Sequence, residues 1–317
     1  MNGFDHEYGL YGLTLRSNRA LPGLAPRRGD APEIVIDFAG RTSDAFQCAD
    51  EPFWQNGFET LWHRDDGSWL LRYVDERDGG FWSVAFANDA TRLTVRWTDD
   101  AMLDDIPSVL QGPGLAAALH LRRVPLLHAS VLATDGGAIA LMGTPGAGKS
   151  TTAAAFVARG HALLSDDLAA LAIDDDGIRV QPGYPRLRLY ADSARAAGFA
   201  ADTLPRVFAA AILGDKRFVA LSPDDGTFCP EPRALRAIYL LQPRRAGGGE
   251  PRIRAVPPRN ALPLLLQNIY SGRFLDASRR AMTMRACARV ADAVPMYTVE
   301  AGDDLAQLPR LVDALAA

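Results

Sequence analysis

The sequence predicts an α/β protein with two domains: a β-rich N-terminal domain over residues 1–103 and an α/β domain over residues 104–317. Up to Trp97, short stretches alternate apolar and polar residues, which is typical of strands that bury one face of a sheet. Farther along, short apolar strands alternate with helical patterns, as in a sheet covered by helices. A length of 317 residues also indicates about two domains.

Four strands are predicted in the N-terminal domain. The segment EIVIDFAG (33–40) has the alternation of one strand, and SWLLRYVDERDGGFWSVAFANDATRLTVRW (68–97) has that of three, separated at the turn sequences DERDGG and ANDAT. All five tryptophans lie in this domain, and aromatic stripes on antiparallel sheets usually form a core face. We assign no chemistry to them, nor to the isolated His6 and His63.

The second domain is predicted to begin with a helix within residues 104–124, after the Gly-Pro-Gly break. The segments PLLHASVLA and GAIALMG then predict two strands joined by the turn TDGG. RAIYLLQP (236–243) is typical of a buried strand, and PRNALPLLLQNIYSGRF begins a helical C-terminal section.

Composition excludes several function classes. A net charge of −4 does not favour nucleic acid as a partner, since a phosphate backbone requires a basic face. Three widely spaced cysteines indicate neither a disulfide framework nor a zinc cluster. The N-terminus lacks signal-peptide features, and no apolar run reaches the roughly 18–20 residues of a membrane span. We therefore expect a cytoplasmic protein with no membrane partner.

The strongest motif is a glycine-rich turn that fits the P-loop pattern G-x-x-x-x-G-K-[ST]. An apolar strand precedes it and the helical segment STTAAAFVARG follows, so a chance Lys-Ser in an ordinary turn is the weaker interpretation. The backbone N–H groups would bind phosphate, Lys149 would reach the β- and γ-phosphates, and Ser150 would ligate Mg²⁺. The predicted nucleotide-binding residues of this segment are Gly143, Thr144, Pro145, Gly146, Ala147, Gly148, Lys149, Ser150 and Thr151.

Two aspartates follow the P-loop helix, in HALLSDDLAAL (161–171). This segment is predicted to be a strand with Asp166 and Asp167 at or near its end, where ligands bind in open α/β sheets. One carboxylate would help to hold Mg²⁺, and the other would accept a proton from an attacking hydroxyl. The alternative is that the pair only caps the next segment or marks a turn. The chain has several other Asp-Asp pairs, so such a pair alone is weak evidence for a site.

The arrangement of His128, Gly143–Ser150, Gly160-His161 and Asp166-Asp167 resembles the HPr kinase/phosphorylase family. The resemblance covers about 45 residues and implies a P-loop kinase domain of HPr-kinase type that transfers the γ-phosphate of ATP to a serine hydroxyl. It implies that Asp166 is the proton acceptor, that Asp167 binds Mg²⁺ and that His128 lies near the phosphates. It also implies a homo-oligomer, of a size that no sequence feature sets.

The chain departs from that family in one respect. The bifunctional enzymes have a glutamate-containing signature after the aspartates, but this chain has GYPRLRLYADSA (183–194) and no glutamate between Glu76 and Glu231. The second acidic Mg²⁺ ligand is therefore missing or is supplied by Asp192. The segments PGYPRLRLY, DKR and YGL are more similar to the HPr-kinase-like tailoring kinases of lasso-peptide gene clusters, which implies a serine of a ribosomal precursor peptide as the acceptor.

Further candidates are cationic. The chain has only two lysines, Lys149 and Lys216. Lys216 and Arg217 would neutralise transferred phosphate, although a solvated turn is an equally good interpretation. Arg186 and Arg188 alternate on an expected strand and would grip a phosphate or a peptide carboxylate, with Arg273 a weaker candidate. His128 remains open between a core histidine and a residue that contacts phosphate or the catalytic Asp, whereas His161 fits a structural role.

Three functions remain open at this stage. The leading one is ATP- and Mg²⁺-dependent phosphorylation of a serine hydroxyl on a peptide, with Asp166, Lys149 and His128 as catalytic residues and Ser150 and Asp167 at the metal. The others are a nucleotide-dependent switch that transfers phosphate to no substrate, and a kinase for free serine or another small hydroxyl compound.

Overall fold

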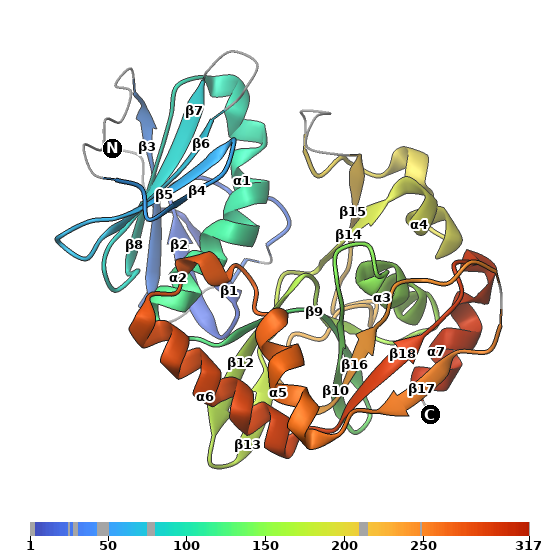
Figure 1. Ribbon diagram of the computed structural model, residues 1–317. Coiled ribbons are helices and arrows are strands. Elements are labelled where there is room, and N and C mark those ends of the chain that lie inside the picture. Colours follow the sequence, from blue (N-terminus) through green and yellow to red (C-terminus); the bar gives the residue numbers. More distant parts are fainter. Residues whose placement is uncertain are drawn as a thin grey trace. The chain divides into compact units, whose positions relative to one another are not determined.

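The computed structural model describes residues 4–24, 26–27, 31–42, 51–74, 80–208, 215–247 and 249–316. The chain forms two compact units, Met1–Arg122 and Arg123–Ala317. The division lies later than the expected boundary between residues 103 and 104, because the helical segment in between belongs to the first unit. Both units combine strands with helices, so the predicted α/β class holds (Figure 1).

The first unit contains a mixed eight-stranded sheet. Its strand order is β1-β2-β3-β8-β7-β6-β5-β4. The β2–β3 and β3–β8 pairs are parallel, and the others are antiparallel. The strands are β1 (His6–Leu10), β2 (Leu13–Ser17), β3 (Ile34–Arg41), β4 (Trp54–Gln55), β5 (Glu59–His63), β6 (Trp69–Val74), β7 (Phe81–Phe86) and β8 (Arg92–Trp97). The four strands predicted for this region are thus present; all of the predicted DERDGG turn except Gly80 lies outside the described residues.

Three tryptophans of this sheet lie on one core face, as predicted, whereas Trp62 lies on the other face. Trp82 pairs directly with Trp97 and with Tyr73, and Trp69 lies four residues before Tyr73 on β6, so all three tryptophans point to one side. Their exposed fractions are only 0–7%. Tyr73 and Trp82 stack with ring centroids 4.6 Å apart, which adds a specific aromatic contact to the burial of apolar area.

The Gly-Pro-Gly sequence does not break the helical segment, contrary to expectation. Helical turns run from Asp100 to Leu121, as η1 (Asp100–Asp104), α1 (Ile106–Val109), the π-helical η2 (Leu110–Gly114) and α2 (Leu115–Leu121). Pro113 lies in the π turn, a form in which helices absorb an interruption of their normal hydrogen bonding. Gln111 Nε2 donates to the Pro22 carbonyl (3.1 Å), and Arg122 pairs with Glu33 (3.2 Å), which ties the segment to the first unit.

The second unit is built on a sheet of order β10-β9-β12-β13-β16-β18-β17, in which β10 also pairs with β16 and β11 with β9. A separate hairpin joins β14 and β15. The strands are β9 (Leu126–Thr134), β10 (Gly137–Met142), β11 (Leu163–Ser165), β12 (Leu168–Asp174), β13 (Gly177–Val180), β14 (Arg186–Tyr190), β15 (Lys216–Ala220), β16 (Arg233–Leu241), β17 (Arg252–Ala255) and β18 (Met296–Glu300). The helices are α3 (Lys149–Ala158), α4 (Ala191–Ala196), η3 (Ala201–Thr203), α5 (Pro258–Gln267), η5 (Gly272–Phe274), α6 (Ala277–Ala293), η6 (Leu305–Gln307) and α7 (Leu308–Ala316).

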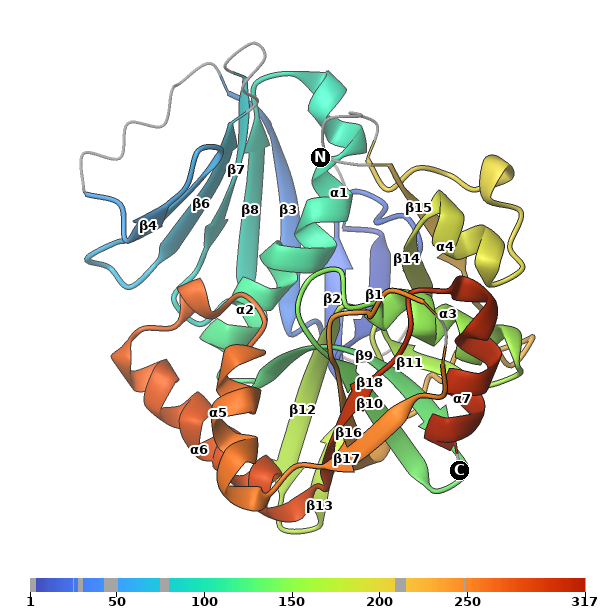
Figure 2. The same ribbon diagram turned by 45° about the vertical axis from the view of Figure 1, so that its right-hand side comes forward.

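Helices cover both faces of this sheet. Leu265 of α5 and Val290 of α6 pack on one face, against Ala140 and Ile238. Phe156 of α3 and Leu311 of α7 belong to the core of the other face. Figures 1 and 2 show the two sets of helices on opposite sides of the strands. The unit is thus a three-layer α/β/α structure.

The ends of four strands meet at one edge of the sheet. Strands β10, β16 and β18 are parallel, and β11 runs in the same direction because both β10 and β11 are antiparallel to β9. Met142, Ser165, Leu241 and Glu300 therefore end their strands at the same edge, where ligands bind in open α/β sheets.

The two aspartates directly follow the end of β11, as predicted, but the segment that was expected to be one strand forms two. It divides into β11 and β12, with Asp166 and Asp167 between them. Asp167 has φ +69°, in the left-handed region that a continuous strand does not visit.

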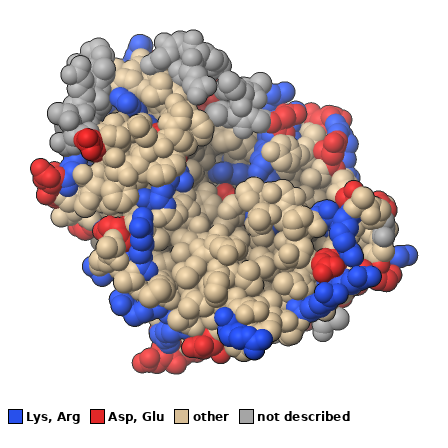
Figure 3. Space-filling view, viewed as in Figure 1, with Lys and Arg blue, Asp and Glu red and all other residues tan. Residues whose placement is uncertain are grey.

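No helix among the described residues is both long and apolar enough to cross a lipid bilayer. On the face shown in Figure 3, Lys and Arg side chains lie among Asp and Glu side chains, and broad areas carry neither.

Gly137 is predicted to be indispensable to the β9–β10 turn. It has φ +142°, and a Cβ there would lie 2.4 Å from the Ala234 carbonyl oxygen, whereas a Cβ on Gly136 would meet no atom within 4 Å. We expect Gly137→Ala to lower the free energy of unfolding by about 2–4 kcal/mol and Gly136→Ala to change it by less than about 1 kcal/mol. Urea denaturation of both variants measures the difference, and equal costs would contradict the crowding seen at Gly137.

Candidate functional site

The glycine-rich turn has the predicted strand–turn–helix context, between the end of β10 and the start of α3. Gly143, Gly146 and Gly148 have φ of +145°, +84° and +94°, which residues with a Cβ rarely adopt. A Cβ on Gly143 would also lie 2.6 Å from the Leu241 carbonyl oxygen. The turn exposes Thr144, Pro145 and Gly146 and buries Ala147, so its backbone wraps around the start of α3.

Lys149 closes this turn from within. Its ammonium group donates to the carbonyl oxygens of Gly143 (2.8 Å) and Thr144 (3.4 Å), and the residue is only 7% exposed. Burial lowers the pKa of Lys149, while the negative charges of Asp167 and Asp166 act in the opposite direction. Since these partners are neutral backbone oxygens, phosphate oxygens can replace them with a gain in charge attraction.

Asp166 is the most enclosed acid of the site, with an exposed fraction of 1%. Its Oδ1 accepts from Ser130 Oγ (2.6 Å) and Ser150 Oγ (3.0 Å), and its Oδ2 accepts from the backbone N–H of Arg188 (3.1 Å). Burial and the neighbouring charge of Asp167 raise the pKa of Asp166, and these three hydrogen bonds partly offset the rise.

Asp167 has a different environment. Its Oδ1 lies 3.1 Å from His128 Nε2, its Oδ2 accepts from the Tyr270 hydroxyl at 3.1 Å, and its side chain is 31% exposed. Burial alone would raise the pKa of Asp167, but the hydrogen bond and charge of His128, with the charges of Arg188 and Lys216, hold it well below its ordinary value. Asp167 is therefore ionised at neutral pH.

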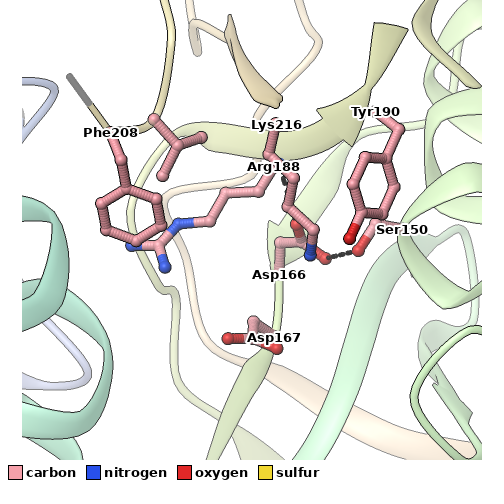
Figure 4. Close-up of a pocket in the computed structure, with 8 residues that line it drawn as sticks. Ser150, Asp166, Asp167, Arg188, Tyr190, Phe208 and Lys216 are labelled. Carbon is pink, nitrogen blue, oxygen red and sulfur yellow. Dashed lines mark hydrogen bonds between the residues drawn. The ribbon is translucent and has the colours of Figure 1, made fainter. Parts of the chain in front are cut away.

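Both aspartates line one cavity of about 300 Å³. Its other lining residues are Ser150, Arg188, Tyr190, Val207, Phe208 and Lys216. In Figure 4, Lys216 and Tyr190 point from the β14–β15 hairpin toward Ser150, whereas the Arg188 side chain turns toward Phe208. The cavity thus has a polar floor beside the glycine-rich turn and an apolar wall opposite.

The two cations of the DKR segment are separated. Lys216 lines the cavity, with its ammonium nitrogen 5.3 Å from the centroid of the Tyr190 ring. Arg217 pairs with Asp215 at 2.9 Å and donates to the Leu204 carbonyl oxygen. Successive side chains of a strand point to opposite sides, so Arg217 faces away from the site predicted for it.

The remaining sequence candidates also separate. Arg188 lines the cavity, while the Arg186 guanidinium lies over the Phe218 ring (4.4 Å) and Arg273 lies over Phe274 (5.0 Å). His161 packs edge-on against Phe156, in keeping with a structural role. Asp192 is 89% exposed and pairs with Arg195, so it supplies no ligand to the cavity in this structure. Thr151 donates to Ser193 Oγ (3.0 Å) and thereby joins α3 to α4.

A magnesium ion fits beside Ser150. Mg²⁺ in phosphate sites typically uses one or two carboxylates, substrate phosphates and water. The described residues contain no cluster of three or more His, Cys, Asp or Glu side chains suited to a metal. The hydroxyl of Ser150 and a carboxylate of the Asp pair are the available ligands, and phosphate oxygens on the glycine-rich turn would complete the set.

Sequence reasoning missed three polar residues of this region. Ser130 lies two positions after His128 on β9 and so faces the same side of the sheet, and this spacing could have predicted that Ser130 belongs to the site. Tyr270 had no local signal. Arg244 follows β16 and donates to the Ala147 carbonyl (3.3 Å), Thr152 Oγ1 (3.0 Å) and the Gly302 carbonyl (3.2 Å), so it fastens the glycine-rich turn from behind.

No protein-family model and no curated protein matches the chain. Among solved structures, the chain is similar to the Hpr(Ser) kinase/phosphatase from Coxiella burnetii, with 13% sequence identity, 60% of this chain and 92% of that chain covered, and a TM-score of 0.33. A similarity this low does not decide fold or reaction, which rest on the residues of this chain.

Arg244 is predicted to position the glycine-rich turn for phosphate. Arg244→Met keeps an unbranched side chain but removes all three hydrogen bonds, so the glycine-rich turn is held less firmly in the shape that binds phosphate. We expect ATP affinity to fall by roughly tenfold, which corresponds to the net contribution of one to two hydrogen bonds. Isothermal titration with ATP measures the change. The neighbouring Arg245→Met is the control, because Arg245 is 45% exposed and pairs with Glu300. Equal losses in both variants would mean that only general positive charge matters.

Proposed function

We propose that this protein is a kinase that transfers the γ-phosphate of ATP, with Mg²⁺, to a serine hydroxyl of a peptide. The observation that carries the proposal is one cavity in which Ser150 of the glycine-rich turn, both aspartates and Lys216 meet. A glycine-rich turn that only bound a nucleotide would not require Lys216 and two carboxylates in the cavity beside Ser150.

Each group has a role in this reaction. The turn and the start of α3 would bind the β- and γ-phosphates, and Lys149 would exchange its carbonyl partners for phosphate oxygens. Ser150 would ligate Mg²⁺, and Lys216 would stabilise charge on the moving phosphoryl group. Because phosphoryl transfer passes through a loose transition state, catalysis would consist mainly of positioning and charge neutralisation. His128 would act through Asp167, which it contacts.

The acceptor is proposed to enter past Tyr190, Val207 and Phe208. Tyr190 is 58% exposed, and Tyr190, Val207 and Phe208 give the cavity part of an apolar lining. Such a lining suits a serine carried on a larger chain better than free serine, which offers little apolar surface. The resemblance of PGYPRLRLY and DKR to lasso-peptide tailoring kinases supports a ribosomal precursor peptide as the substrate class.

Labelled ATP distinguishes the three functions. The protein is incubated with γ-labelled ATP and Mg²⁺, together with serine-containing peptides, their Ser→Ala counterparts, or free serine. We expect label on the serine peptides only. Label on free serine would replace the peptide by a small acceptor, and release of label only as inorganic phosphate would favour a nucleotide-dependent switch.

Lys149→Met is predicted to abolish transfer. The substitution removes the ammonium group from the phosphate end of the turn while retaining a long side chain, so we expect turnover to fall by at least roughly 10²-fold. Arg159→Met, at the end of the same helix, removes an exposed cation that pairs with Asp313 and should leave turnover unchanged. Parental activity in Lys149→Met would exclude the glycine-rich turn as the phosphate site.

A further inference from the structure

The two aspartates of the site differ in what they contact. Asp166 is almost fully enclosed, and two of its three hydrogen bonds come from the hydroxyls of Ser130 and Ser150. When the Ser150 hydroxyl donates a hydrogen bond to Asp166, the lone pairs of its oxygen remain available to bind a cation. Ligands of bound metals are usually held in this way by a second group, which fixes their orientation. The contacts of Asp166 are therefore those of a metal partner.

Asp167 is placed differently. Its backbone is left-handed, with φ +69°, a region that residues with a Cβ adopt rarely and mainly where surrounding contacts enforce it. His128 and Tyr270 supply these contacts, one at each carboxylate oxygen. The side chain remains 31% exposed and lines the cavity. A proton acceptor must lie within hydrogen-bond reach of the hydroxyl it serves, and Asp167 offers the more open oxygens.

We infer that Asp166 is the metal partner of Ser150 and that Asp167 is the residue that receives the proton of the acceptor hydroxyl. This division rests on the proposed kinase function and reverses the roles that the family resemblance implies. In the reaction, the acceptor oxygen bonds to the γ-phosphorus and the bond from that phosphorus to the β–γ bridging oxygen breaks. The electron pair stays on ADP, and the acceptor proton goes to a carboxylate oxygen of Asp167.

The directions of the pKa shifts alone would favour Asp166 as the stronger base. Geometry decides against Asp166, since it is 1% exposed, whereas the side chain of Asp167 is 31% exposed. A weak base also suffices where the transition state is loose, because the acceptor proton is lost late. The low pKa of Asp167 is therefore compatible with its role.

The test uses the full chain with Asp166→Asn, Asp167→Asn and, as control, Asp192→Asn. ATP affinity is titrated with excess Mg²⁺ and again with EDTA, which reports on the metal without requiring turnover. We expect Asp166→Asn to reduce the gain in affinity from Mg²⁺ by roughly tenfold or more. Asp167→Asn and the exposed Asp192→Asn should keep the parental gain. The inference would be overturned if Asp167→Asn lost the Mg²⁺-dependent gain in ATP affinity while Asp166→Asn kept it.

Turnover is the second readout. It is followed as transfer to the serine peptide and as hydrolysis of ATP, in which water takes the place of the acceptor. Asp167→Asn should lower kcat by roughly 10²–10⁴-fold with little change in the KM for ATP. Parental kcat in that variant would overturn the assignment. If no peptide is phosphorylated, the peptide proposal fails, while Mg²⁺-dependent affinity and hydrolysis still decide the roles of the aspartates.

Two single-hydroxyl variants guard against misfolding of the Asn variants. Ser130→Ala removes a donor from Asp166, and Tyr270→Phe removes one from Asp167. We expect the first to weaken the Mg²⁺-dependent gain in ATP affinity, and the second to lower kcat at saturating Mg²⁺ while leaving that gain intact. The reverse pattern in variants with parental melting temperatures would contradict the inference.

Discussion

The candidate site depends on one buried carboxylate. Asp166 accepts hydrogen bonds from Ser130 on β9, Ser150 on α3 and the backbone of Arg188 on β14, so a single side chain joins three elements. A carboxylate that is 1% exposed would be strongly destabilising without such partners, and removing one of them leaves an acceptor with part of its desolvation cost uncompensated. The bond to Arg188 helps to hold the β14–β15 hairpin beside the glycine-rich turn, together with the apolar packing of Leu187 and Leu189 in the core that α3 shares.

The candidate site also balances its charges. Lys149, Lys216 and Arg188 act electrostatically on the two aspartates, and each cation comes from a different element. Burial opposes ionisation of Lys149, while the aspartates favour it. ATP with Mg²⁺ would bring both a polyanion and a dication to the site, so its charges would meet partners of opposite sign already in place. Such preorganisation spares the reorganisation that water would require in the transition state.

The sequence predicted the parts of the fold that local patterns determine. Strands β6 to β10, helix α3 and the glycine-rich turn lie where periodicity and glycine spacing indicated them. Local patterns failed at Pro113, where a π turn absorbs the proline, and at the aspartates, where the strand divides. They also missed Ser130, Arg244 and Tyr270, whose hydrogen-bond partners lie 36, 97 and 103 residues away along the chain. Only the folded chain brings those partners together.

The interruption between β11 and β12 explains how two neighbouring carboxylates serve one cavity. In an unbroken strand, the side chains of adjacent residues point to opposite faces of the sheet, and one of the two charges would be directed into an apolar layer. The left-handed backbone of Asp167 breaks this alternation, and both residues line the same space. Asp166 then contacts the hydroxyl of the glycine-rich turn, and Asp167 contacts His128 and Tyr270. A local backbone cost thus separates two chemically identical groups into different environments, which is the condition for giving them different tasks.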